Sequence, residues 1–261
     1  MSVSRMARKA TKAAALPFGL AEPMRRGDVA ILLYHRVGAG NREIDLDTPA
    51  FERQMAYLGD LAKVRTLDEA LASDGSGGVV VTIDDGLRDF HEHVLPVVMR
   101  HSIPVVLYLA TGLVAGAATA RAADALTWSH LGEAVSTGLV TIGSHTHNHV
   151  DLSKVSEEEA EVEMRRSRGL IEDRLGVPCQ HFAYPWAVSS PAAERAVRRH
   201  FRSAALRWQT NRRGRIDPFR LGRTPVLRSD DGMFFRAKVA GRLDKEAVAY
   251  RLLRRGPWRR A

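Results

Sequence analysis

Short apolar runs that alternate with helical patterns constrain the fold of this chain more than any other feature. Three of the runs are apolar throughout rather than at every second position, as is typical of strands that are covered on both faces. Two shorter runs follow later in the chain. The five predicted strands are residues 29–35 (VAILLYH), 78–84 (GVVVTID), 104–110 (PVVLYLA), 139–145 (LVTIGSH) and 181–185 (HFAYP).

Helical patterns fill the intervals between these runs. The first is predicted to start with Thr48 as its cap and Pro49 at the first helical position, and the second covers the stretch LRDFHEHVLPVVMRH. The third has Ser156 and Glu159 as a capping box and ends on Gly176. Strands that alternate with helices predict an α/β fold on a parallel sheet, either open or closed into a barrel.

Composition limits the kinds of site and the location that this chain can have. The single cysteine, Cys179, excludes a disulfide within the chain and a cysteine-rich zinc site, so a metal would need histidine and carboxylate ligands. The apolar run AAALPFGLA is short and interrupted by Pro17, which makes it a poor signal-peptide core. No stretch approaches the roughly 18 apolar residues of a membrane span. We therefore predict a cytoplasmic protein.

The net charge of +9 is concentrated towards the C-terminus. From residue 195 onwards there are 20 Lys and Arg residues against 5 Asp and Glu residues, which favours an anionic partner; the alternative is a solvated face. Both ends place cations beside apolar residues, such as Met6, Leu252 and Trp258. This pattern suits peripheral contact with an anionic membrane surface, here the inner face of the membrane, whereas no signature predicts nucleic-acid binding. We expect a basic N-terminal extension (1–27), one main domain (28–240) and a basic C-terminal tail (241–261).

Three polar clusters follow the predicted strands, at the ends where parallel α/β folds carry their chemistry: YHR, TIDDG and SHTHNH. Neighbouring side chains on a strand point in different directions, so one of Asp84 and Asp85 can bind a divalent cation while the other faces the reacting centre. His145 and His149 are spaced to share one face of a helical turn and could complete a site with two histidines and one carboxylate. His147 would then be a bystander, although on an extended backbone it could compete as a ligand.

These motifs resemble those of the polysaccharide deacetylases of carbohydrate esterase family 4. TIDDG matches the family pattern T-F-D-D-G, HTHNH matches H-[ST]-x-x-H, and ILLYHRVG and FAYPW resemble a subgroup with a Y-H-R-[VI] first strand. The resemblance implies a distorted (β/α) barrel of about seven strands and metal-dependent removal of N- or O-acetyl groups from sugars. It implies Asp84 as the general base and Asp85, His145 and His149 as metal ligands. Zinc is the expected metal, with cobalt, nickel or manganese able to substitute.

The third family motif, R-x-P-Y, is altered in this chain. Here the motif reads AYPWA, so Trp186 takes the position whose backbone N–H serves as oxyanion donor, and Tyr184 and Trp186 become candidates for substrate binding. Trp186 could equally be a core residue or a platform for a sugar ring. Ala183 stands where many members carry an arginine that orients the base, and Arg223 is the candidate replacement.

The family's general acid, a histidine in a late L-x-H motif, has no clear counterpart here. We therefore assign this role to His35 at the end of the first predicted strand; the alternative is a core histidine bonded to the backbone.

The predicted function is hydrolysis of acetyl groups on an N-acetylated sugar or glycan, by a metal-activated water and the Asp84 base. Two alternatives stay open: a noncatalytic relative that binds glycans or anions, and a hydrolase of another small amide, such as a formylated lipid-linked sugar. Substrate choice lies in loops whose sequence does not identify the glycan.

Overall fold

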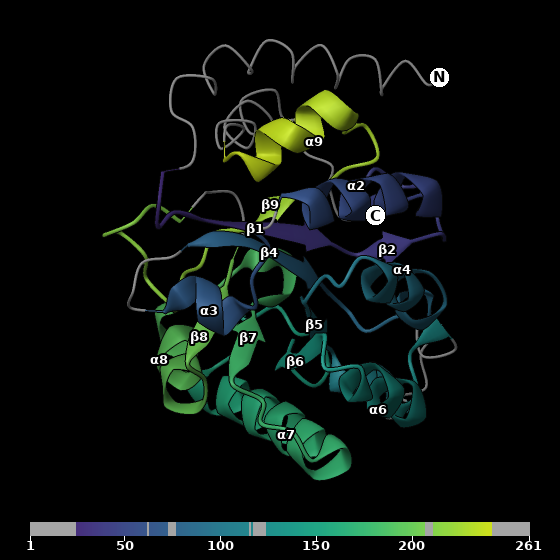
Figure 1. Ribbon diagram of the computed structural model, residues 1–261. Helices are drawn as coiled ribbons and strands as arrows, with labels where there is room; N and C mark the ends of the chain where they lie inside the picture. Colours follow the sequence, from purple (N-terminus) through teal and green to yellow (C-terminus); the bar gives the residue numbers. More distant parts are fainter. Residues whose placement is uncertain are drawn as a thin grey trace.

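A curved parallel sheet of seven strands forms the centre of the structure, in the order β8-β7-β6-β5-β4-β1-β9 (Figure 1). The computed structural model describes residues 25–61, 63–72, 77–114, 116, 124–206 and 211–241. Each strand pairs in parallel with its neighbours. The strands are β1 (Val29–Tyr34), β4 (Gly78–Ile83), β5 (Val105–Leu109), β6 (Val140–Ser144), β7 (His181–Ala183), β8 (Ser203–Ala205) and β9 (Thr224–Pro225).

One short segment connects the two edges of this sheet. Leu221 pairs with Ala205 of β8, and three residues later Thr224 pairs with Leu32 of β1. Residues 221–225, called the closing segment below, therefore join β8 to β1. With this connection the sheet becomes the distorted (β/α) barrel of about seven strands that was predicted.

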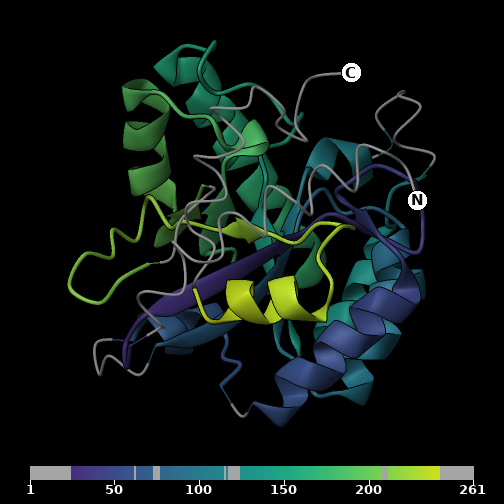
Figure 2. The ribbon, with the colours of Figure 1, turned by 90° about the horizontal axis from the view of Figure 1, so that it is seen from above.

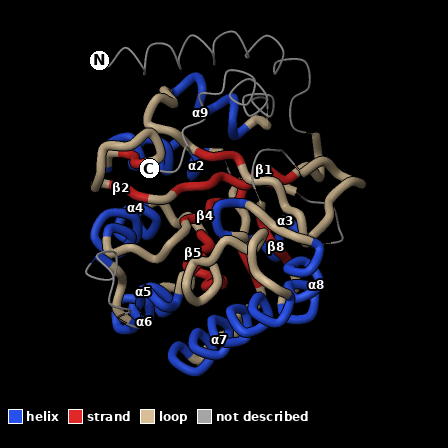
Figure 3. Tube along the Cα trace, turned by 180° about the vertical axis from the view of Figure 1, so that it is seen from behind, coloured by secondary structure: helices blue, strands red, loops and turns tan. Residues whose placement is uncertain are grey.

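The helices lie around the strands, as the blue and red tubes in Figure 3 show. Seen from above in Figure 2, α9 lies beside β1. A small second sheet pairs β2 (Arg36–Val37) with β3 (Asp45–Leu46) after the end of β1. The helices are α2 (Thr48–Asp60), α3 (Leu67–Leu71), η1 (Phe90–Val94), α4 (Leu95–Arg100), α5 (Thr111–Val114), α6 (Trp128–Ser136), α7 (Glu157–Leu175), η3 (Pro185–Ala187), α8 (Pro191–His200) and α9 (Gly232–Val239).

The predicted elements are present, with small shifts at their ends. All five predicted strands are found, each within two residues of its expected limits. The capping box of Ser156 and Glu159 is confirmed, and Gly176 ends α7 in the left-handed conformation. The predicted cap of α2 was wrong by one residue, because Asp47 caps the helix and Thr48 is already helical.

Alternation along each strand separates two groups of buried side chains. On β4, Val79 and Val81 pack in the larger apolar core on the outer side of the sheet, and Val80 packs in the smaller cluster inside the barrel. Because side chains alternate between faces, Thr82 and Asp84 share the inner face with Val80. The same rule places further side chains inside the barrel at its carboxyl end: His35 after β1, Tyr108 on β5, His145 after β6 and Ala183 on β7.

No helix in the described ranges is long and apolar enough to span a membrane. The predicted basic extension and basic tail lie almost entirely outside the described residues, so the domain limits of 28 and 240 stay a prediction.

Candidate metal centre and active site

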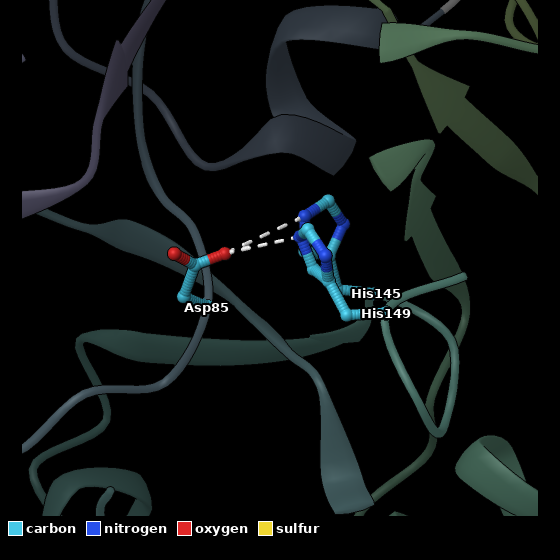
Figure 4. Close-up of side chains that lie close together, drawn as sticks. All are labelled: Asp85, His145 and His149. Carbon is cyan, nitrogen blue, oxygen red and sulfur yellow. Dashed lines mark ion pairs between the residues drawn. The ribbon is translucent and has the colours of Figure 1, made fainter. Parts of the chain in front are cut away.

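Three potential metal ligands meet beyond the carboxyl ends of β4 and β6 (Figure 4). One nitrogen each of His145 and His149 and one carboxylate oxygen of Asp85 all lie within 4.8 Å of one another. Asp85 Oδ1 is 3.8 Å from His145 Nε2 and 3.4 Å from His149 Nε2. Asp85 and His145 are buried and His149 is half-buried. The structure thus brings the three predicted ligands together, and their role as metal ligands stays a prediction.

The donor set fits a divalent transition metal. Ligands about 2.1 Å from a tetrahedral ion are about 3.4 Å from one another, close to the observed separations. His145 Nδ1 lies 2.7 Å from the Ala183 carbonyl and donates to it, which leaves Nε2 as the ligand atom. Burial lowers the pKa of His145 to about 4, so the imidazole is neutral, as a metal ligand must be. Burial opposes ionisation of Asp85, but His149 beside it holds the pKa of that carboxyl well below its usual range.

His145 and His149 come together through a turn and not through a helix. Residues 145–149 contain no helix, and Thr146 and His149 have φ values of 65° and 55°. The predicted pairing of the two histidines is therefore confirmed, but the helical geometry behind it was wrong. His147 lies apart from the donor cluster, since its Nδ1 is 2.9 Å from Thr111 Oγ1 in a buried hydrogen bond.

A buried ion pair sits next to the donor cluster. Both oxygens of Asp84 accept hydrogen bonds from the Arg223 guanidinium, at 2.6 Å to Nη1 and 2.8 Å to Nη2. Burial opposes ionisation of Asp84, but the charge and hydrogen bonds of Arg223, together with His145 and His35, outweigh it and lower the pKa of the carboxyl overall. Asp84 Oδ2 is also 3.8 Å from His145 Nε2. An ionised carboxylate is thereby held beside the three ligands without belonging to them.

Arg223 reaches this position from the closing segment, where it lies between the contact to β8 and the contact to β1. Its side chain is 1% exposed, and Nε donates to the Leu206 carbonyl at 3.0 Å. Thr82 Oγ1 accepts a hydrogen bond from Nη1 at 3.4 Å, and the Tyr108 ring lies 5.4 Å from the guanidinium carbon. Thr82 and Tyr108 were not among the predicted site residues, although their inward positions on β4 and β5 follow from strand alternation.

Of the three other predicted site residues, the structure brings two to this centre. His35 is half-buried at the end of β1, and its charge contributes to lowering the pKa of both Asp84 and Asp85. Trp186 is 46% exposed, and its ring meets the His149 ring edge-on at 4.9 Å.

Tyr184 is the predicted site residue that the structure places elsewhere. Its side chain is fully buried in the outer core, where the ring packs edge-on against Phe182 at 5.2 Å. Strand alternation explains this, because Phe182 and Tyr184 share the face opposite Ala183. A role of the Tyr184 side chain in substrate binding stays a prediction without a contact to the centre.

Backbone strain is concentrated in the loops of this centre. Within the described ranges six residues other than glycine have positive φ, and five of them belong to the loops after β4, β6 and β7: Asp85, Thr146, His149, Trp186 and Ala187. Such conformations cost roughly 1–3 kcal/mol each and persist only where the surrounding structure holds them. The strained residues therefore lie in the loops that carry the three donor residues and Trp186.

Many arginines of the basic C-terminal region are paired. On α8, Arg195 and Arg199 form ion pairs with Glu157 of α7 at 2.7 and 2.8 Å, and Arg220 pairs with Glu194 at 2.7 Å. These arginines join α8 to its neighbours, so part of the positive charge counted in the sequence serves contacts within the domain.

Comparisons with known proteins agree with this fold. The family profile described as Polysaccharide deacetylase matches residues 72–202, and the chain belongs to this family. YxkH, a protein of Bacillus subtilis (strain 168) named for the same family, is 25% identical over 162 residues. That match covers 59% of this chain and spans about half of YxkH, 55% of its length.

Solved structures of other proteins share the fold. IcaB from Ammonifex degensii superposes with a TM-score of 0.71 and 24% identity, covering 85% of this chain and 100% of that chain. The Streptococcus pyogenes deacetylase PplD, solved in complex with acetate, gives a TM-score of 0.72 at 19% identity. The superposition covers 85% of this chain and 99% of the PplD chain. BC0361, a polysaccharide deacetylase from Bacillus cereus, gives a TM-score of 0.71 at 20% identity. The superposition covers 81% of this chain and 69% of the BC0361 chain. At these identities the likeness concerns the barrel itself.

Proposed function

We propose that this protein is a metal-dependent hydrolase that removes acetyl groups from an N-acetylated sugar or glycan. One observation carries the proposal: the Asp85, His145 and His149 donors lie directly beside a buried, arginine-paired carboxylate, Asp84. Water alone is too weak a nucleophile for an amide at neutral pH. A metal site with an adjacent base is an arrangement that overcomes this limit.

Asp85, His145 and His149 would hold the metal, and zinc is the default for this ligand set. When bound, such an ion lowers the pKa of a water molecule and polarises the acyl carbonyl. Asp84 takes the proton of the attacking water as the new C–O bond forms. His35 gives a proton to the sugar nitrogen as the C–N bond breaks, and acetate and the free amine leave.

Two further groups are assigned from their positions. The Trp186 backbone N–H, in the strained turn after β7, is proposed to donate to the developing oxyanion. The exposed part of the Trp186 ring, beside His149, is proposed to pack against a sugar ring of the substrate. The choice of glycan lies in the loops around this centre and not in the barrel motifs.

Metal-dependent acetate release tests the proposed function. The purified protein is stripped with a chelator, reloaded separately with zinc, cobalt, nickel or manganese, and incubated with N-acetylglucosamine oligomers and with an aryl acetate. Acetate release that requires metal and is lost in Asp84→Asn supports the proposal. Binding of the oligomers without release by any metal form would favour a noncatalytic relative. Release of formate but not acetate from matched substrates would favour the other amide hydrolase.

We also propose peripheral contact with an anionic membrane surface on the cytoplasmic side, based on the sequence of the basic ends. Each cation near an anionic leaflet contributes about 1 kcal/mol, and salt screens it. Sedimentation with vesicles of anionic or neutral lipid, at low and high salt, checks this. We expect salt-sensitive binding to anionic vesicles alone. Equal binding to both lipids, or to neither, would contradict it.

A further inference from the structure

Lys238 is a buried cation that the proposed chemistry does not use. It lies on α9, has 0% exposed side-chain surface, and is therefore in an unusual place for a lysine. Its Nζ donates to the Pro225 carbonyl at 2.8 Å and to Asp230 Oδ2 at 2.8 Å. Asp230 Oδ2 also accepts from Leu227 N at 2.7 Å. Replacing such a pair by apolar residues is often neutral or stabilising, so its presence calls for a reason other than stability.

Through the Pro225 carbonyl, Lys238 binds the last residue of the closing segment. Pro225 is the last residue of β9 and follows Arg223 by two positions. β9 has only two residues and lies at one edge of the sheet, paired with β1 alone. So short a strand has little pairing of its own to set its register.

Asn211 binds the residue that precedes Arg223 in the closing segment, Gly222. Its side-chain Nδ2 donates to the Gly222 carbonyl at 2.9 Å, and Gly222 N donates back to its Oδ1 at 2.7 Å. The Asn211 backbone is itself paired with Val29 at the start of β1, with N–O distances of 2.9 and 3.0 Å. Asn211 is 5% exposed, so these hydrogen bonds are shielded from water.

Arg223 thus lies between two buried polar contacts, one to the residue before it and one to the residue two positions after it. Register decides the direction of its side chain, because a shift of one residue turns every side chain of a strand to the opposite face. A shifted closing segment would direct Arg223 out of the barrel. Asp84 would then lose both hydrogen bonds of the guanidinium.

We propose that Asn211 and the Lys238–Asp230 pair are positioning residues that fix the register of the closing segment, so that Arg223 binds both oxygens of the Asp84 base. Both groups bind the closing segment and act through Arg223. The catalytic consequence rests on the proposed function, whereas the structural consequence does not. Misplacement of a catalytic group by about 1 Å can cost about 100-fold in rate, so a fixed register matters.

The test removes the pair without leaving a lone buried charge. In the double variant Lys238→Met/Asp230→Asn, the side-chain oxygen of the new asparagine can still accept the hydrogen bond from Leu227 N. We therefore expect a melting temperature close to that of the wild type. We expect kcat to fall about tenfold or more, with KM little changed. Ser203→Ala is the control, because it removes a buried hydrogen bond to His181 at the amino ends of β7 and β8. It should lower stability and leave kcat unaltered.

A double-mutant cycle separates positioning from a general effect on the fold. The Lys238→Met/Asp230→Asn change is measured again in an Arg223→Gln background, and Asn211→Asp is treated in the same way. If these residues act through Arg223, their effect on kcat should fall below about twofold in that background. If kcat falls by the same factor in both backgrounds, or does not fall in the wild-type background, the proposal is overturned.

Nuclear magnetic resonance of the Arg223 guanidinium gives a readout that needs no turnover. A bidentate pair restricts rotation of the guanidinium, so the wild type should show separate Nη signals. Lys238→Met/Asp230→Asn and Asn211→Asp should show averaged Nη signals. Separate signals in every variant would refute the positioning role. If the wild type shows them but releases acetate from no substrate, the proposed function fails and the positioning role stands.

Discussion

The metal-donor side and the base side of this centre are built in different ways. The donors come from two short motifs at the ends of β4 and β6, and His145 and His149 are only four residues apart. The proposed base, Asp84, is paired with Arg223, which is 139 residues away and which we propose is positioned by residues on two further segments. A local motif therefore supplies the proposed ligands, whereas tertiary packing pairs the proposed base with its arginine. Changes on the two sides should separate metal binding from turnover.

Loss of a donor histidine should have the largest effect. In His149→Ala and His145→Ala only two of the three ligands remain, so we expect substoichiometric metal and loss of nearly all acetate release. Metal analysis after gel filtration measures this. His147→Ala is the matched control, because His147 bonds to Thr111 outside the cluster and its loss should leave metal content unchanged. A full complement of metal in His149→Ala would exclude it as a ligand.

Removal of the base should separate the two sides most clearly. Asp84→Asn keeps all three donors, so metal content should match the wild type, while kcat should fall by about 10²–10⁴-fold because proton transfer is lost. Metal stoichiometry and rate are measured on the same preparation. A near wild-type rate would remove Asp84 from its assigned role.

Loss of the orienting arginine should have a smaller catalytic effect and a larger structural one. Arg223→Ala leaves the Asp84 carboxylate buried without its partner, for which about 3–5 kcal/mol of destabilisation is expected. Metal should still bind, and kcat should fall by less than in Asp84→Asn. Thermal unfolding and kinetics together check this. Unchanged kinetics would leave the base without an assigned orienting group.

The proposed acid should have the smallest effect of this series on the centre. His35→Ala keeps the metal and the base, so we expect a moderate loss of kcat, together with loss of one limb of the pH–rate profile. The effect should depend on the leaving group. The phenolate of an aryl acetate leaves without a proton, so His35→Ala should hydrolyse this ester almost as well as the wild type does. An unchanged profile with the amide substrate would make His35 a packing residue.

The sequence alone determined five of the seven barrel strands and most of the residues that meet in the centre. Long apolar runs predict buried parallel strands because both faces are covered, and polar clusters at their ends meet because carboxyl ends of parallel strands lie together. Asp84, Asp85, His145 and His149 became candidates in this way without any tertiary information, and the resemblance to the family implied their separate roles. Even Arg223 was a candidate, because Ala183 lacks the side chain that the family uses.

The tertiary structure decided what depends on distant contacts and on single backbone angles. β8 and β9 have three and two residues, too few for a periodic signal, and only the join between Leu221 and β8 makes the sheet a barrel. The turn that unites His145 and His149 depends on left-handed residues that no spacing rule predicts. Nothing in the sequence distinguishes Lys238 from an ordinary surface lysine. Its burial against Pro225 arises only when α9 packs beside β1, because a charge is tolerated there solely through partners that the fold brings to it.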